Sequence, residues 1–217
     1  MKKRIEALKR LRHSAGLGGY PLPAIHDEQR PAKALVITCS ESPVLGMFAA
    51  SIDPLLIFQN WGGTPTVSCA AVNGHGGIDS ECGMIQYAID TLGLEHIVLC
   101  GHSKCRVPAL LHNGTWACSH PETPGEQLCA EIVQEDTTAP EEHLSRIWLA
   151  RQMARLDDWL AEIDRPKENN IVTHALWFDE HQGDIFTYSK EKKQFLLMSD
   201  IDMERLFDAL ESGHHHA

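Results

Sequence analysis

The sequence contains no apolar run that could cross a membrane, because nothing in it approaches the roughly 18 consecutive apolar residues that a spanning helix needs. Basic residues are in the minority: 19 Lys and Arg stand against 30 Asp and Glu, for a formal net charge of -11. Contact with nucleic-acid phosphates requires a basic surface, so this charge argues against a nucleic-acid partner. The basic start Met1–Arg4 is followed by an amphipathic mixture and not by an apolar signal core, so we expect no secretion signal.

A disulfide framework is also lacking. The seven cysteines are odd in number, and no two of them have the Cys-x-x-Cys spacing of a redox pair. The odd number and the spacing of the cysteines favour a reducing compartment, and we expect a cytoplasmic protein. A thiol-redox role for Cys39 is the weaker hypothesis, because no second cysteine stands at resolving distance. Five cysteines have no ligand-like spacing and are interpreted as ordinary thiols: Cys69, Cys82, Cys100, Cys118 and Cys129.

The 217 residues are enough for one domain with a substantial core. We predict an N-terminal helical arm and linker over residues 1–24, a domain over 25–212, and a tail over 213–217 that is either native or a tag remnant. In the arm, apolar residues recur at helical spacing over 2–13, whereas glycines and prolines mark 14–23 as a linker.

Strand and helix patterns alternate along the domain. Apolar runs predict strands at 34–38, 54–58, 97–100 and 171–177, with an edge strand at 184–188. Helical patterns are found at 47–52, about 80–92, 141–163 and 200–210, and an irregular exposed stretch at 114–140. This order predicts an α/β fold with a mainly parallel sheet flanked by helices, in which sites lie at the carboxyl ends of strands.

Two of the predicted strands end at metal-ligating side chains. The strand at 34–38 runs into Cys39, and the strand at 97–100 runs into His102 and Cys105, which we place on one side of the first helical turn that follows. Thiolate and imidazole are preferred ligands of zinc, and a catalytic zinc keeps its fourth position for water. Cys39, His102 and Cys105 are therefore the predicted zinc ligands.

These residues resemble the pattern of the β-class carbonic anhydrases, Cys-x-Asp-x-Arg followed by His-x-x-Cys. The resemblance covers about residues 25 to 195, and its other matching segments include Gln29-Arg30-Pro31, Asn60-Trp61-Gly62, Ile85-Gln86-Tyr87-Ala88 and Leu92-Gly93-Leu94-Glu95-His96. It implies reversible hydration of carbon dioxide to bicarbonate by a zinc-bound hydroxide, in a homodimer or higher homo-oligomer with substrate pockets at subunit interfaces. It assigns to the substrate pocket Gln29, Asn60, Trp61 and Gly62.

The chain departs from this pattern at the family's paired Asp and Arg, which orient the hydroxide. Glu41 and Pro43 stand at those positions, so the carboxylate has a longer arm and the clamping guanidinium is missing. Arg106 stands where the family has Gly, directly after the last ligand. Because Arg pairs well with a carboxylate, we predict that Arg106 supplies the guanidinium, pairs with Glu41, and is catalytic together with it.

Other interpretations stay open. The longer arm of Glu41 could reach zinc as a fourth ligand and close the site. A pocket lined by Trp61 and Arg106 could hydrolyse a carbon dioxide analogue such as carbonyl sulfide or carbon disulfide. The chain could also be a catalytically silent, zinc-stabilised assembly module. Three histidines could line a proton path to zinc, although a lone histidine is more often structural: His75, His96 and His174.

Overall fold

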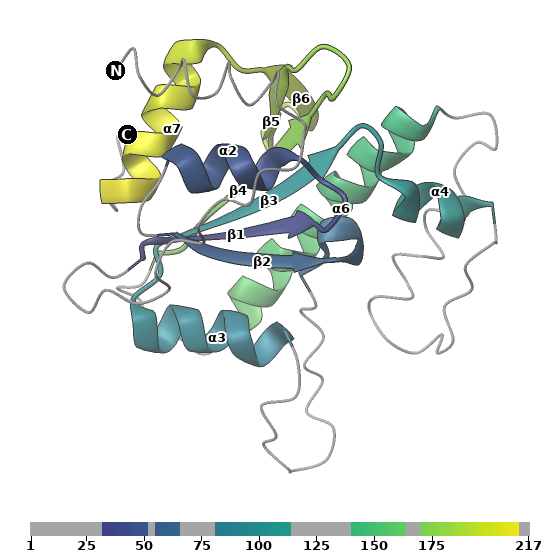
Figure 1. Cartoon of the computed structure of the whole chain (residues 1–217). Coiled ribbons are helices and arrows are strands. Elements are labelled where there is room, and N and C mark those ends of the chain that lie inside the picture. The colour runs from purple at the N-terminus through teal and green to yellow at the C-terminus, as the bar shows by residue number, and fades with distance from the viewer. Residues whose placement is uncertain (1–31, 52–54, 66–80, 114–139, 164–169, 213–217) are drawn as a thin grey trace, which may run out of the picture.

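In the computed structural model, which describes residues 32–51, 55–65, 81–113, 140–163 and 170–212, a six-stranded sheet runs through the protein (Figure 1). Its spatial order is β2-β1-β3-β4-β5-β6. The parallel part consists of β2 (Leu56–Asn60), β1 (Ala34–Cys39), β3 (His96–His102) and β4 (Val172–Phe178). Antiparallel pairs then add β5 (Ile185–Ser189) and β6 (Gln194–Leu197). The predicted α/β fold with a mainly parallel sheet is confirmed.

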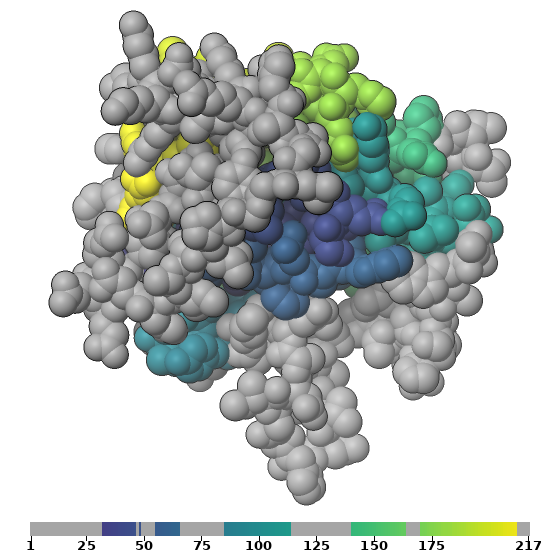
Figure 2. Space-filling view, viewed as in Figure 1, coloured from purple at the N-terminus to yellow at the C-terminus, as the bar shows by residue number. Residues whose placement is uncertain are grey.

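Helices cover both faces of this sheet. α3 (Glu81–Leu92) and α6 (Glu141–Glu162) pack on one face, while α2 (Val44–Ser51) and α7 (Asp200–Ser212) pack on the other (Figure 1). The short helix α4 (Arg106–His112) follows β3. In the space-filling view of Figure 2, the purple and blue surface of residues 32–65 adjoins teal surface of the 81–113 segment at the right of the molecule.

Side chains alternate between the two faces along each central strand. In β1, Leu35 and Ile37 belong to the core under α3 and α6, whereas Ala34 and Val36 belong to the core under α2 and α7. Every residue of β1 is buried. A parallel strand that is covered on both faces needs apolar side chains on both, which explains why it reads as a nearly continuous apolar run.

The strand predicted at 184–188 is not the edge strand. It corresponds to β5, and β6 pairs with it over the register from Phe186↔Leu197 to Ser189↔Gln194. β6 is only four residues long and is exposed at both ends, and its short apolar run Phe195-Leu196-Leu197 was not assigned to a strand from the sequence. The C-terminal part does supply an edge strand, but that strand is β6.

The other predicted elements lie where the structure has them, with shifted ends. The helix predicted to begin at 47 begins at Val44, and the strand predicted at 97–100 extends over His96–His102. The predicted arm, linker and tail lie outside the described residues, as does nearly all of the irregular stretch at 114–140. Within the described ranges, no helix has both the length and the apolarity for crossing a membrane.

The turn after β2 passes close beneath the ends of β1 and β3. It is a single 3-10 turn, η1 (Trp61–Gly63), in which Gly62 and Gly63 have φ values of 80° and 62°. A Cβ on Gly63 would lie 2.9 Å from the backbone nitrogen of Cys39 and 3.3 Å from the carbonyl oxygen of Cys100. Backbone atoms cannot move aside as a side chain can, so this position requires glycine.

We expect Gly63→Ala to destabilise the protein more than Gly93→Ala. Both glycines have positive φ, which costs an alanine about 1–2 kcal/mol, but a Cβ on Gly93 would meet no atom within 4 Å. Gly93→Ala is thus a matched control for backbone strain without a clash. Urea unfolding measures the free energy of unfolding of each variant, and equal losses would contradict the steric argument at Gly63.

Candidate metal centre

Parallel pairing of β1 with β3 brings two of the predicted ligands to the same edge of the sheet. The register joins Thr38 to Cys100, so Cys39 and His102 both lie at carboxyl ends. Cys105 follows in a turn closed by a 3.3 Å hydrogen bond from its N–H to the carbonyl oxygen of His102, and it directly precedes α4. The prediction that His102 and Cys105 share a helical turn is wrong, because His102 is still the last residue of β3.

The side chains of Cys39, His102 and Cys105 form a compact group. All three are buried, and their potential ligand atoms lie within 4.8 Å of one another. The Sγ atoms of Cys39 and Cys105 are 3.9 Å apart, and both thiols are free. Among the described residues, Cys39, His102 and Cys105 are the group of His, Cys, Asp and Glu side chains that is compact enough to hold a metal ion. Glu41 does not belong to this group.

His102 offers one ring nitrogen to this group. Its Nδ1 lies 2.7 Å from Oε1 of Glu180, whereas its Nε2 is buried and has no hydrogen-bond partner among the described residues. A buried polar atom without a partner costs free energy, and a metal ion at Nε2 would satisfy it. Two thiols and one imidazole nitrogen fit a tetrahedral zinc that keeps one position open.

The cysteine pair carries negative charge at Cys39. A hydrogen bond from the Cys105 thiol lowers the pKa of Cys39 to about 4 against the opposing effect of burial, and contacts with His102 and the backbone N–H groups of Glu41 and Gly62 also lower it. The same contact with Cys39, together with burial, raises the pKa of Cys105. One thiolate therefore forms readily, while a second requires a cation beside it. A divalent metal would supply that positive charge.

Glu41 and Arg106 form an ion pair beside the cysteines. Nε of Arg106 donates to Oε1 of Glu41 at 2.7 Å, Nη2 donates to the same oxygen, and the backbone N–H of Arg106 donates to Oε2 at 3.5 Å. This guanidinium lowers the pKa of Glu41, so the carboxylate is ionised near neutral pH. The backbone N–H of Glu41 also donates to Sγ of Cys39 at 3.5 Å, which fixes the ion pair next to the buried cluster.

Asn60, a predicted pocket residue, closes the loop after β2. It is the register partner of Cys39 at the end of β2. Its side-chain amide donates to the carbonyl oxygen of Thr64 at 2.6 Å and accepts from the Thr64 N–H at 2.8 Å. The side chain of Asn60 therefore holds the shape of the loop that carries the other pocket residues.

Trp61 and Gly62 lie in this loop with different environments. The Trp61 side chain is 57% exposed, whereas Gly62 is buried and its carbonyl oxygen accepts a hydrogen bond from Nε1 of Trp148 at 3.0 Å. Gln29, the fourth predicted pocket residue, lies outside the described residues.

Glu180 is a residue of this site that the sequence interpretation missed. It lies in the polar turn after β4, the strand that pairs with β3 on the side away from β1. The available signal was its position, because a carboxylate directly after a predicted parallel strand lies at the edge where sites form. Strand order was the missing information, since without it nothing places this turn against the end of β3.

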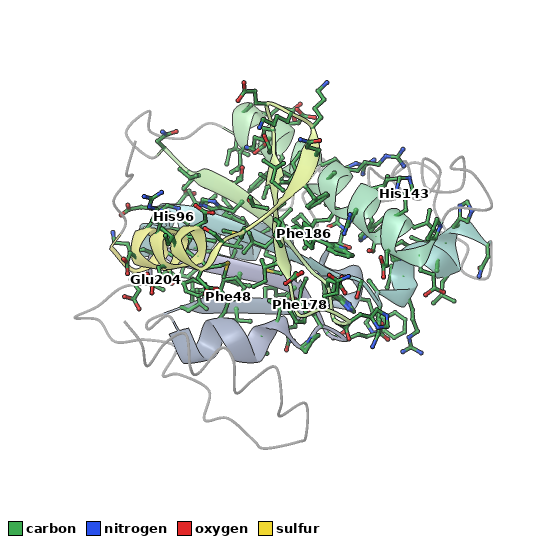
Figure 3. The ribbon with its side chains drawn as sticks, turned by 90° about the horizontal axis from the view of Figure 1, so that it is seen from above. Phe48, His96, His143, Phe178, Phe186 and Glu204 are labelled. Carbon is green, nitrogen blue, oxygen red and sulfur yellow. The ribbon has the colours of Figure 1, made fainter. Side chains whose placement is uncertain are left out.

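Two of the histidines considered for a proton path lie elsewhere. His96 and His174 stack on each other with ring centroids 5.4 Å apart. His96 is the first residue of β3 and His102 the last, and Figure 3 shows His96 well apart from Phe178, the register partner of His102. Neither of these two histidines therefore lies at the metal site, and His75 lies outside the described residues.

Residues 34–185 match the model of the carbonic anhydrase family. The chain belongs to this family. It is similar to beta carbonic anhydrase 1 of Caenorhabditis elegans, with 21% identity over 207 residues that cover 77% of each chain. It is also similar to a carbonic anhydrase of Synechococcus elongatus, with 36% identity over 112 residues that cover 48% of this chain and 37% of that one.

Solved β-carbonic anhydrases share the fold. The structure of the β-carbonic anhydrase CcaA matches with a TM-score of 0.58 and 18% identity, over 92% of this chain and 85% of that one. CafA of Aspergillus fumigatus matches with a TM-score of 0.50 and 16% identity, over 84% and 85% of the two chains. The β-class resemblance drawn from the residues is thus confirmed, and the family supports a lyase that hydrates carbon dioxide in general terms.

We expect the protein to bind about one Zn²⁺ or Co²⁺ per chain, and expect Cys39→Ser, His102→Ala and Cys105→Ser each to weaken binding strongly, because each removes a ligand. Cys100→Ala is the matched control, since Cys100 is buried but does not belong to the cluster. Competition with a chelator measures the affinity. Affinity should also fall on acidification, because protons compete with the metal for thiolate and imidazole. Undiminished binding by Cys39→Ser would contradict this site.

Proposed function

We propose that the protein catalyses the zinc-dependent, reversible hydration of carbon dioxide to bicarbonate. The observation that carries this proposal is the ion pair between Glu41 and Arg106, which stands beside a buried Cys-His-Cys cluster. A carbonic anhydrase of this class needs a metal and an anchored carboxylate that orients the nucleophile. This chain has residues that fit both needs, although Glu41 replaces the family's Asp and the guanidinium comes from Arg106 instead of from the position of Pro43.

Cys39, His102 and Cys105 would hold the metal. When bound, zinc supplies hydroxide near neutral pH by lowering the pKa of water to about 7. Glu41 would orient this nucleophile, because Oε1 is occupied by the Arg106 guanidinium while Oε2 has only the 3.5 Å contact with the Arg106 N–H. An ionised carboxylate accepts hydrogen bonds and donates none, so Glu41 would fix where the nucleophile's proton points and leave a lone pair for carbon dioxide.

Arg106 would act by holding Glu41 in place. It is the first residue of α4, so its guanidinium reaches Glu41 from the β3 side of the site, whereas the family's Arg follows two residues after the Asp. Two donors from one guanidinium fix the direction of a carboxylate better than one donor does. This anchoring would compensate for the extra methylene of Glu41, which otherwise gives the carboxylate more freedom than an Asp has.

The same ion pair argues against Glu41 as a fourth metal ligand. Its carboxylate is bound by Arg106 and lies outside the group of potential ligand atoms. To reach the metal, Glu41 would have to give up the charge-assisted hydrogen bonds to the guanidinium. We therefore propose an open site, in which Glu41 acts as a hydrogen-bond acceptor.

We expect zinc-loaded wild-type protein to hydrate carbon dioxide in a stopped-flow assay, and Arg106→Ala to lower kcat by about 10²-fold because the carboxylate loses its anchor. Arg205→Ala is the matched control, since it removes an exposed Arg from α7. Carbonyl sulfide and carbon disulfide are assayed in parallel. A higher kcat/KM for either analogue than for carbon dioxide would replace the proposed substrate.

A rescue variant tests the role of the guanidinium. Glu41→Asp with Pro43→Arg, introduced into Arg106→Ala, rebuilds the family's Asp and Arg and should restore activity that Arg106→Ala has lost. If the zinc-loaded wild type is inert and the change of Glu41 and Pro43 alone activates it, the proposal is wrong. The protein would then be a silenced anhydrase with a role in assembly.

We also propose that the protein forms a homodimer or higher homo-oligomer in a reducing compartment such as the cytoplasm. Trp61 supports assembly, because its side chain is 57% exposed and burying a Trp against a partner is favourable. The free thiols of Cys39, Cys100 and Cys105 fit a reducing compartment. Light scattering should give the mass of two or more 24.2 kDa chains, and Trp61→Ser should lower it. A monomeric wild type would contradict the proposal.

A further inference from the structure

Glu180 contacts a candidate metal ligand directly. Its Oε1 lies 2.7 Å from Nδ1 of His102, and the two side chains are 19% and 1% exposed. An ionised carboxylate can only accept a hydrogen bond, so the tautomer that fits this contact keeps its proton on Nδ1, and Nδ1–H donates a hydrogen bond to Oε1 of Glu180. The lone pair of the neutral ring is then on Nε2, the buried nitrogen that has no hydrogen-bond partner among the described residues.

Hydrogen bonds between the segments after β3 and β4 hold Glu180 at this position. The backbone N–H of Glu180 donates to Oγ of Ser103 at 3.1 Å, and the N–H of Ser103 donates to the carbonyl oxygen of Phe178 at 2.9 Å. Ser103 is buried and immediately follows His102. The backbone of Glu180 is therefore tied to the same segment that carries the ring it contacts.

The turn that contains Glu180 is also closed from within. Oδ1 of Asp179 accepts hydrogen bonds from the N–H groups of His181 at 2.8 Å and Gln182 at 3.3 Å. The carbonyl oxygen of Asp179 accepts from the N–H of Gly183 at 2.7 Å, where φ is 73°. A turn with this many internal bonds places Glu180 before any ligand arrives, so little further ordering is needed when a metal binds.

We propose that Glu180 is a positioning residue for the metal: it holds His102 in the tautomer protonated at Nδ1 and aims Nε2 toward Cys39 and Cys105. This inference rests on the proposed zinc site. A carboxylate behind a ligating histidine fixes the ring and makes it a stronger donor, and its loss weakens metal binding about 10–100-fold. Lys104 is the nearby cation, with Nζ 3.8 Å from Oε2 of Glu180.

The test compares the Co²⁺ affinity of full-length variants by chelator competition at one pH. Glu180→Ala should bind Co²⁺ about 10–100-fold more weakly than the wild type. Glu180→Gln keeps an acceptor oxygen for Nδ1–H and should recover part of that loss, which a purely structural role would not produce. Glu191→Gln is the matched control, because it removes the same negative charge as Glu180→Gln. Glu191 is exposed and lies in the turn between β5 and β6.

A second readout follows the proton on the ring. In ¹⁵N-histidine-labelled, Zn²⁺-loaded protein, His102 should show an exchange-protected Nδ1–H signal that Glu180→Ala loses and Glu191→Gln keeps. Circular dichroism of the metal-free variants confirms that each is folded. Co²⁺ affinity of Glu180→Ala within twofold of the wild type, or a protected Nδ1–H in that variant, would overturn the proposal.

The outcomes separate this inference from the proposed function. A wild type that binds neither Co²⁺ nor Zn²⁺ would defeat the zinc site and this inference with it. Tight binding by the wild type and by Glu180→Ala alike would defeat the positioning role alone and leave the proposed hydration activity standing.

Discussion

The site depends on the register between β1 and β3. Because neighbouring side chains of a strand point to opposite faces, a slip by one residue would exchange the two cores that β1 separates. Leu35 and Ile37 fill one core, and Ala34 and Val36 fill the other. The hydrophobic burial that fixes this register also fixes where Cys39 and His102 leave the sheet. The candidate metal ligands are thus positioned by the packing of residues that lie outside the cluster.

The ion pair between Glu41 and Arg106 shows that the fold brings together a carboxylate and a guanidinium that lie 65 positions apart in the chain. Glu41 has a longer arm than an Asp, and Arg106 reaches it from the start of α4. Pro43 is exposed just before α2, where Oγ of Ser42 accepts a hydrogen bond from the N–H of Val44 at 3.3 Å. At the position of the family's Arg, this chain therefore has Pro43, directly before α2. The guanidinium that pairs with Glu41 comes from Arg106 at the start of α4.

Charge around the cluster is organised in two layers. The cysteine pair forms the inner layer, in which the pKa of Cys39 is lowered by the Cys105 thiol and that of Cys105 is raised by Cys39. Glu41 and Glu180 form the outer layer, and each is accompanied by a cation from the segment after β3, Arg106 or Lys104. A divalent ion would complete the inner layer, because it relieves the repulsion that opposes a second thiolate.

The sequence by itself predicted the parallel strands and the three candidate ligands, because each predicted strand is an apolar run and two of these runs lead into metal-ligating side chains. It offered the pairing of Glu41 with Arg106 as one of several interpretations. It did not determine that β6 pairs with β5 as the edge strand, that His96 lies away from the site, or that the carboxylate of Glu180 contacts Nδ1 of His102. Those features depend on strand order and on which turn faces which strand end. They join residues as far as 78 positions apart, so only the folded sheet decides them.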